Sequence, residues 1–405
     1  MQKIYLDHSA TTPLDPQVLK KMQPYLTDVF GNASSAHSFG QEAMKGIDWA
    51  REQLVNLFGC KFKEIIFTSG ATESNNLVIQ GILKAFKQNK DEKYHIITSK
   101  IEHPAVLEPC QELVKQGLIE VTYVGVDKKG LVNVAEIKKA IKDNTILVSI
   151  MYVNNEIGTI QPIREIGKMI EKVNKQRLKE KDKVSVFDKV YFHTDAVQAV
   201  NYCKMNAPYL HADLITISAH KIYGPKGVGA FYIRENTPLK AITLGGHQEY
   251  NFRPGTYNVA GIVGLGAAVE LINDRVANEK INQQIEKLRD KLISGLKNKI
   301  PDIKINGDME NRVPANANIS FLNAEGESML LMLDLEDIAV STGSACASGS
   351  LEPSHVLRAL GIPPEICHAS LRFTLGKGTT GKEINKVIEV LPPIIERLRK
   401  MSPLK

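Results

Sequence analysis

The chain has 405 residues, of which 43% are hydrophobic and 24% charged, and its formal net charge is +6. This length favours two domains, or a large domain with a smaller companion, over one small core. No apolar run reaches the roughly 18 residues that a membrane span needs, and the N-terminus lacks the apolar stretch of a signal peptide. We therefore expect a cytoplasmic protein without membrane contact. The mild basicity gives no reason to expect direct contact with nucleic acid.

The order of apolar runs predicts the fold class. Between about residue 60 and residue 235, short apolar runs alternate with helical patterns, which predicts a mostly parallel sheet covered by helices on both faces. Ligands of such sheets bind at the carboxyl ends of the strands. After residue 260 the pattern becomes helical, with a long amphipathic helix that ends at Pro301 and bridges into a second domain. Pro392-Pro393 is expected to break or kink the helical tail. The predicted strands are 64–68, 94–98, 121–124, 146–151, 190–194, 214–218 and 228–233.

One lysine follows a predicted buried strand directly. Lys221 comes after the strand 212–218 and before the turn at Gly224-Pro225, which places it at the ligand-binding edge of the sheet. Partial burial lowers the pKa of a lysine and makes its amine a nucleophile, as a Schiff base with an aldehyde cofactor requires. Taken alone, the position fits a surface lysine at a turn equally well.

Two further patterns support a pyridoxal-phosphate (PLP) site. Asp195 ends another apolar strand, where a buried acid is costly unless it pairs with a cation such as the protonated pyridine nitrogen of PLP. The segment 67–75 is a strand end, a glycine turn and a helix start, so its backbone N–H groups and the Thr72 hydroxyl form a phosphate cup. Helix capping is the alternative for each pattern.

The five cysteines are odd in number, far apart and without CxxC spacing, which argues against a disulfide framework or a zinc site. Cys346 lies in 341–350, where every other residue is Ser, Thr, Gly or Ala, so we expect a mobile segment with an exposed, reactive thiol. The other four have mixed or apolar neighbours and are predicted to be structural: Cys60, Cys110, Cys203 and Cys367.

Taken together, these residues resemble the NifS/IscS-type cysteine desulfurases, which are fold-type-I PLP enzymes related to the class-V aminotransferases. The resemblance covers nearly the whole chain. It implies an α/β fold with a large PLP-binding domain at 15–262, built on a mostly parallel sheet flanked by helices. A smaller α+β domain, 1–14 with 263–405, would carry the catalytic cysteine loop. The motifs that carry the resemblance are 5–13, 68–74, Glu102-His103, 154–158, 195–198, 218–227 and 343–346.

The resemblance also implies roles for single residues around the cofactor ring. Lys221 would bind PLP as a Schiff base, and Asp195 would pair with the pyridinium nitrogen. Gln198 would hydrogen-bond the ring oxygen. His103 would stack on the ring and assist proton transfer; without the resemblance, a buried structural histidine is the better interpretation.

The phosphate and the substrate would be held by a second set of residues. Thr256 would reach the phosphate from the neighbouring subunit, which implies a homodimer. Asn155, which also contacts the cofactor, and Arg372 would bind the substrate carboxylate, a task suited to a bidentate arginine. Within the same subunit the phosphate ligands would be Ala71, Thr72, Ser218 and His220.

The activity implied is the removal of sulfur from L-cysteine, which gives L-alanine and a persulfide on Cys346. L-selenocysteine is kept as an alternative substrate. The sulfur would pass to an acceptor protein, such as an iron–sulfur scaffold, or to thio-cofactor or tRNA thiolation. No resident metal is expected, although Cys346 could ligate a transferred cluster transiently.

Two other classes of function stay open. Another fold-type-I PLP enzyme, an aminotransferase or a lyase, would share Lys221, Asp195 and Thr72 but would not need Cys346. A non-catalytic adaptor with the same fold would have lost the lysine or the aspartate, and both are present.

Overall fold

A computed structural model describes residues 3–86, 93–179, 185–342 and 352–401. Its larger part is built on a seven-stranded sheet with the order β2-β8-β7-β6-β5-β3-β4. All neighbouring strands are parallel except β8, which is antiparallel to both β2 and β7. The strands are β2 (Ile65–Thr68), β3 (Tyr94–Ser99), β4 (Ile119–Val124), β5 (Thr145–Ser149), β6 (Tyr191–Asp195), β7 (Leu214–Ser218) and β8 (Gly229–Ile233). The predicted mostly parallel sheet is confirmed.

The direction of β8 follows from its connection. Only residues 219–228 join β7 to β8, and so short a link cannot carry a crossover back to the start of a parallel neighbour. The chain therefore reverses at once, and the lysine-bearing turn lies at the carboxyl end of β7. That turn includes Tyr223 in the left-handed region, with a φ of 63°.

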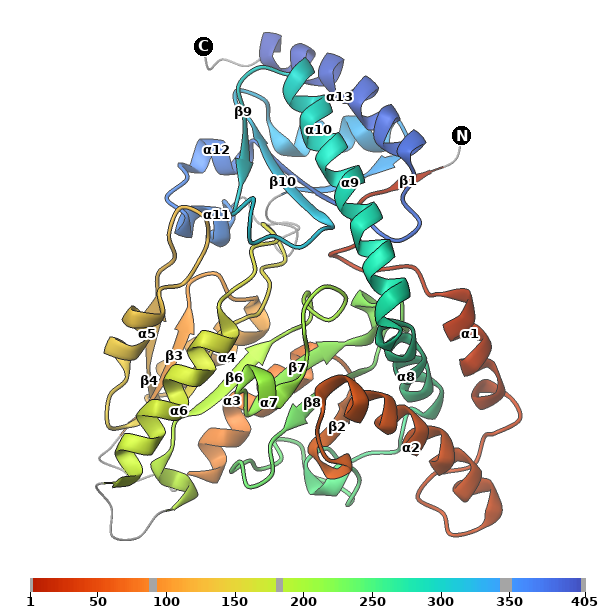
Figure 1. The fold of residues 1–405 in the computed structure, drawn as a ribbon, viewed down its shortest axis with the longest axis vertical. Coiled ribbons are helices and arrows are strands. Elements are labelled where there is room, and N and C mark those ends of the chain that lie inside the picture. The colour runs from red at the N-terminus through yellow and green to blue at the C-terminus, as the bar shows by residue number, and fades with distance from the viewer. Residues whose placement is uncertain (1–2, 87–92, 180–184, 343–351, 402–405) are drawn as a thin grey trace.

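Helices cover both faces of this sheet, because its central strands are buried on both sides (Figure 1). One face packs against α3 (Ala71–Ala85) and α4 (Pro104–Lys115). The opposite face packs against α2 (Ser38–Phe58), α6 (Ile163–Lys179) and α8 (Val259–Asn273). Shorter helices in the same part of the chain are α1 (Pro16–Met22), α5 (Val134–Ala140) and α7 (Ala207–Leu210).

The second part has its own sheet and its own apolar core. Its four strands are antiparallel in the order β12-β13-β10-β9, and β1 pairs with β11 beside them. The strands are β1 (Ile4–Tyr5), β9 (Ile303–Asn306), β10 (Asn316–Phe321), β11 (Ile338–Ala339), β12 (Ser341–Thr342) and β13 (Ser370–Thr374). The helices are α9 (Arg275–Lys299), α10 (Gly326–Asp334), α11 (His355–Ala359), α12 (Pro364–His368) and α13 (Gly381–Met401).

The long helix α9 bridges the two parts, as its periodicity predicts (Figure 1). Pro392-Pro393 was predicted to break or kink the tail; the break is wrong, because α13 runs through both prolines, and the kink stays a prediction. Its apolar face is buried in the core that it shares with α9, and this packing offsets the missing backbone hydrogen bonds. The domain limits, 15–262 against 1–14 with 263–405, stay a prediction.

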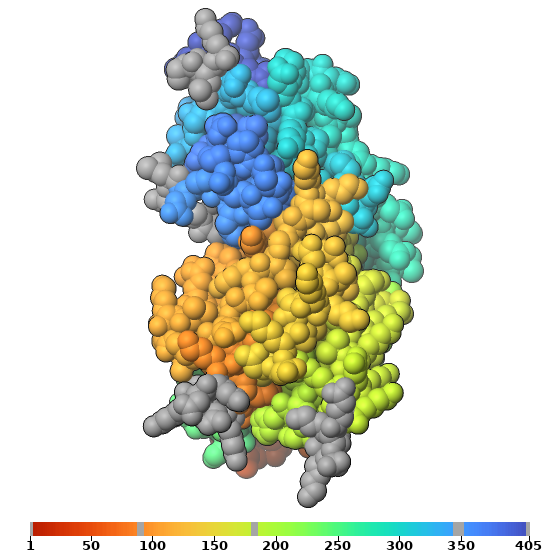
Figure 2. All heavy atoms as spheres, turned by 90° about the vertical axis from the view of Figure 1, so that its left-hand side faces the viewer, coloured from red at the N-terminus to blue at the C-terminus, as the bar shows by residue number. Residues whose placement is uncertain are grey.

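The two parts meet over the carboxyl ends of the central strands. Figure 2 shows the α11–α12 region, in blue, seated on the end of the larger part. The N-terminal segment also joins them: the Thr374 carbonyl accepts a hydrogen bond from the His8 backbone, and the His220 carbonyl accepts one from the Thr12 backbone. Among the described helices, none combines the length and apolarity that crossing a bilayer requires.

The central strand β6 gives a direct test of this core. Phe192 is fully buried in β6, so Phe192→Ala removes an aromatic side chain and leaves a cavity. We expect the free energy of unfolding to fall by about 3–5 kcal/mol, measured by urea denaturation of the cofactor-free protein. Phe30→Ala, at a side chain that is 74% exposed, is the control and should change it by less than about 1 kcal/mol. Equal losses in both variants would contradict the assignment of β6 to the core.

Candidate active site

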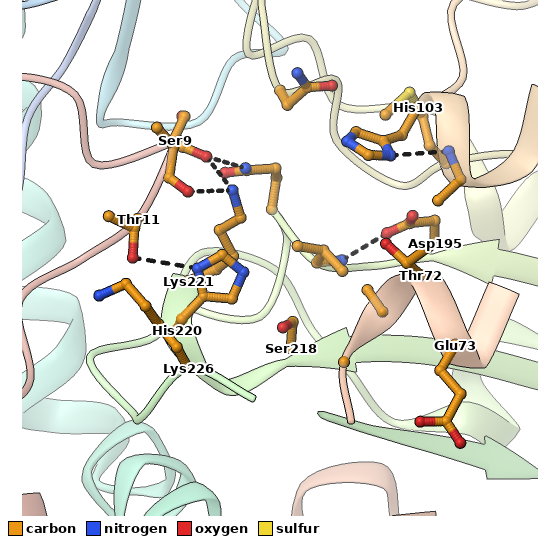
Figure 3. A pocket seen from close by; sticks show the side chains of 18 of the residues that line it. Ser9, Thr11, Thr72, Glu73, His103, Asp195, Ser218, His220, Lys221 and Lys226 are labelled. Carbon is orange, nitrogen blue, oxygen red and sulfur yellow. Dashed lines mark hydrogen bonds between the residues drawn. The ribbon is translucent and has the colours of Figure 1, made fainter. Parts of the chain in front are cut away.

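A cavity of about 580 Å³ opens where the carboxyl ends of β6 and β7 face the second part. Figure 3 shows Lys221, His220 and Thr11 on one side and Asp195, Thr72 and His103 on the other. The cavity brings together ten residues predicted from the sequence: Ala71, Thr72, His103, Asn155, Asp195, Gln198, Ser218, His220, Lys221 and Arg372.

Asp195 is the last residue of β6 and is only 6% exposed. Its Oδ2 accepts a hydrogen bond from Asn75 Nδ2 at 2.7 Å, and its Oδ1 accepts one from the Val197 backbone at 3.0 Å. These amide donors orient the carboxylate but do not neutralise it. A cationic ring nitrogen in the cavity would complete its environment, so the site fits the pyridinium of PLP. Asn75 was missed as a site residue because nothing local in the sequence indicates that it reaches β6.

Lys221 ends the short helix Ala219–Lys221 that follows β7. Its Nζ donates hydrogen bonds to the backbone carbonyls of Ser9, at 2.5 Å, and Ala10, at 2.7 Å. Gln198 Nε2 donates to the same Ser9 carbonyl at 3.0 Å. The N-terminal segment therefore forms one wall of the cavity and holds the lysine ammonium there. The sequence places Lys221 at the sheet edge but does not reveal this wall.

His103 is the N-cap of α4, and its Nδ1 accepts a hydrogen bond from the Ala105 backbone at 3.1 Å. A neutral ring in this position carries its proton on Nε2. Burial lowers the pKa of His103; the nearby Asp195 carboxylate opposes this effect, and Lys221 adds to it. The ring is thus an uncharged, fixed plane at the cavity, which suits stacking on an aromatic cofactor.

The predicted phosphate cup lies between β2 and α3. Gly70, with a φ of 155°, turns the chain between them, and the first backbone N–H groups of α3 are oriented toward the cavity end. Gly229 packs so closely that a Cβ there would lie 2.8 Å from the Gly70 Cα. A built Cβ on Gly70 would itself stand 3.9 Å from Ser218 Oγ. The lack of a side chain on Gly229 therefore lets β8 approach the Gly70 turn closely, beside the start of α3.

His220 completes this side of the cavity. Its Nδ1 shares a hydrogen bond with Thr11 Oγ1 at 3.2 Å. Burial, with Lys221 and Lys226 nearby, lowers the pKa of His220 to about 4, so the ring is neutral near pH 7. A neutral imidazole keeps one N–H donor, the kind of group that a phosphate accepts from.

Arg372 lines the cavity from the second part of the chain. It lies on β13, is 1% exposed, and its Nη2 is 2.8 Å from Asp7 Oδ1. Its Nη1 donates to the Asn155 carbonyl at 3.1 Å, whereas its buried Nε has no hydrogen-bond partner in the described structure. The contacts with Asp7 and Asn155 therefore hold the guanidinium in one orientation at the cavity. The sequence did not predict Asp7 as its partner.

The fully buried carboxyl of Glu102 immediately precedes His103. Its Oε1 accepts hydrogen bonds from Ser99 Oγ at 2.6 Å and from the Met151 backbone at 2.9 Å. Its Oε2 has no partner among the described residues. Burial raises the pKa of Glu102 to about 8, so the group is a neutral acid near pH 7. The sequence analysis names this residue within the Glu102-His103 motif but predicts no role for its carboxyl group.

The described structure leaves the roles of two predicted residues untested. Cys346 lies outside the described residues. Thr256 is exposed and does not line the cavity of its own chain. The assigned roles therefore stay predictions.

The other four cysteines carry thiols of low reactivity. Burial raises the pKa of Cys60, Cys110 and Cys203 to about 12 and that of Cys367 to about 11, so each stays a thiol near pH 7. Over the described ranges, no group of three or more His, Cys, Asp or Glu side chains is arranged to hold a metal ion.

Comparison with known proteins first gives the class. The profile of the family described as Aminotransferase class-V matches residues 4–387, nearly the whole chain and both of its parts.

Closer relatives narrow this class. A cysteine desulfurase IscS of Dictyoglomus turgidum is 50% identical over 404 residues, which cover 100% of this chain and 97% of that protein. A solved structure described as a NifS-like protein matches with a TM-score of 0.85 and 35% identity, covering 99% of each chain. Another, described as SspA in complex with cysteine, has a TM-score of 0.79 and 35% identity over 94% of this chain and 100% of that chain. The chain belongs to the cysteine desulfurase family of class-V aminotransferases, which confirms the predicted family and fold.

The buried Glu102 predicts a pH dependence of stability. Its pKa is about 8 in the folded protein and about 4.5 when the chain unfolds, so folding retains a proton between these values. The contribution of Glu102 is fully present below pH 4.5 and is lost as the pH rises through 8, by at most about 1.4 kcal/mol per pH unit. Glu102→Gln mimics the neutral acid and does not titrate. The free energy of unfolding of this variant, relative to that of the wild type, should therefore increase from pH 5 to pH 8. Parallel curves for the two cofactor-free proteins would refute the assignment.

Proposed function

We propose that this protein is a PLP-dependent cysteine desulfurase that transfers sulfur from L-cysteine to Cys346. The observation that carries the proposal is one cavity in which Lys221, Asp195 and His103 face a buried Arg372, in a chain 50% identical to a cysteine desulfurase. When bound, PLP supplies an electron-withdrawing ring that stabilises negative charge at the substrate Cα.

The residues of the cavity divide the binding task between them. Lys221 would hold the cofactor as a Schiff base, with Asp195 at the ring nitrogen, Gln198 at the ring oxygen and His103 stacked on the ring. The phosphate would lie at the start of α3, which is consistent with the close approach of Gly70 and Gly229. Its ligands would be Ala71, Thr72, Ser218 and His220 from the same subunit and Thr256 from its neighbour, in a homodimer.

The substrate carboxylate would bind Arg372 and Asn155. Lys221 then takes the proton from the substrate Cα, and the Ser9 and Ala10 carbonyls accept hydrogen bonds from the resulting ammonium. The Cys346 thiolate attacks the substrate sulfur, so that a sulfur–sulfur bond forms and the bond from that sulfur to Cβ breaks. The electron pair of the broken bond stays on the carbon side, and Cβ takes up the proton that the Cys346 thiol released. One L-cysteine and one thiol thus give one L-alanine and one persulfide, so the atoms balance.

The proposal extends to the fate of the sulfur. The persulfide would pass to an acceptor protein, such as an iron–sulfur scaffold or a thiolation carrier, in the cytoplasm. L-selenocysteine has the same carboxylate and amine as L-cysteine and is kept as an alternative substrate.

The role of Cys346 is tested by removing its thiol. Cys346→Ala should still bind PLP, seen as visible absorbance, but should release no sulfide and form little alanine from L-cysteine. In the wild type, mass spectrometry after incubation with L-cysteine should find one added sulfur on Cys346. Cys60→Ala is the matched control and should keep full activity, because burial holds that thiol protonated. Substantial sulfide release by Cys346→Ala would refute the proposal.

Arg372→Lys tests the carboxylate site. Lysine keeps the charge but loses the planar pair of donors, so we expect the KM for L-cysteine to rise about 10- to 100-fold. PLP absorbance should stay unchanged, which separates substrate binding from cofactor binding. Arg358→Lys, at an exposed arginine on α11, is the control. A KM within about twofold of the wild type would show that Arg372 does not bind the substrate.

A further inference from the structure

A strained segment beside the cavity touches the predicted phosphate site at two points. Glu249, Tyr250 and Asn251 are consecutive and not glycine, yet all three lie in the left-handed region, with φ values of 45°, 54° and 68°. Such a run is unfavourable for L-residues and persists only where surrounding contacts impose it. The contacts of segment 249–253 lead to residues 67–73, which we call the phosphate turn.

The first contact is a buried ion pair at the edge of the sheet. Glu249 Oε1 lies 2.6 Å from Arg51 Nη2, and the two side chains are 2% and 4% exposed. Glu249 Oε2 accepts a hydrogen bond from the Phe67 backbone at 2.7 Å. Arg51 donates to the Ile65 carbonyl and lies over the Phe67 ring, 4.7 Å from its centroid. The pair thus hydrogen-bonds the backbone of β2 at two positions, the Phe67 N–H and the Ile65 carbonyl.

These hydrogen bonds matter because β2 is an edge strand. Among the strands of the described residues, β2 pairs only with β8, so none of them holds its outer backbone groups. Glu249 takes the place of a neighbouring strand for the Phe67 N–H. The chain then has only Thr68, Ser69 and Gly70 before α3 begins, so the position of Phe67 sets the position of the first N–H groups of that helix.

The second contact neutralises an acid in the cavity wall. Glu73 lines the cavity, and its Oε1 lies 2.9 Å from Arg253 Nε. Its Oε2 accepts a hydrogen bond from the Ser69 backbone at 2.6 Å, so the same carboxylate ties Arg253 to the phosphate turn. Left without Arg253, this carboxylate would repel a phosphate at the start of α3.

We propose that Glu249 and Arg253 are positioning residues for the cofactor phosphate: Glu249 fixes the phosphate turn through Phe67, and Arg253 fixes and neutralises Glu73. Neither residue needs to touch the cofactor. The inference rests on the proposed function, because it takes the phosphate turn as the PLP phosphate site. It predicts that the two residues matter only for ligands that carry the phosphate.

The test compares two ligands that differ in that group. Dissociation constants for PLP and for pyridoxal, which lacks the phosphate, are measured by titrating the cofactor-free protein and following visible absorbance. Arg253→Met should weaken PLP binding about tenfold and leave pyridoxal binding within about twofold. Adding Glu73→Gln should restore most of the PLP affinity, because the amide still accepts from Ser69 but no longer repels the phosphate. Glu249→Gln should also weaken PLP binding selectively.

Matched controls make the outcome decisive. Lys142→Met breaks an exposed ion pair of similar length, with Glu120 at 2.8 Å, and should change neither constant. If Glu249→Gln does not fold, since it leaves Arg51 buried without its partner, the Arg253 series decides alone. Equal weakening of both ligands in Arg253→Met, no weakening, or no rescue by Glu73→Gln would overturn the inference. A wild type that binds neither ligand would instead overturn the proposed function on which the inference rests.

Discussion

The site depends on one buried carboxylate that faces the cavity. Asp195 lies at the end of a fully buried strand, where an isolated charge is costly. Asn75 and the Val197 backbone orient it with two hydrogen bonds, and the open side faces the cavity that Lys221 lines. A protonated pyridine ring that carries an aldehyde would pair with the Asp195 carboxylate and take the Lys221 amine as a Schiff base, so the geometry suits this kind of cofactor.

The N-terminal segment makes the remaining parts of the site act together. It joins Asp7 to Arg372 of the second sheet and joins the Ser9 carbonyl to Lys221 at the end of β7. One short stretch of chain therefore relates the residue proposed for the substrate carboxylate to the residue proposed for the cofactor. Segment 249–253 makes a second such connection, because it joins the edge strand β2 to Glu73 near the start of α3.

The sequence predicts features that depend on neighbouring residues, and it misses those that depend on partners far away in the sequence. The strands of the large sheet and the strand-end positions of Lys221 and Asp195 have local signals, and so does the glycine turn before α3. Asn75, Asp7 and Glu249 had none, since each acts through a partner that is distant in the sequence. The predicted break at the two prolines of α13 failed for the same reason. Packing against α9 outweighs the tendency of proline to end a helix.

The most direct measurement is to trap the cofactor on the protein. Borohydride reduction of the PLP-loaded enzyme fixes a Schiff base as a stable secondary amine, and peptide mass spectrometry then locates the modified lysine. We predict a single phosphopyridoxyl group on Lys221. A label on Lys226, which also lines the cavity, or the lack of any label on Lys221, would contradict the account.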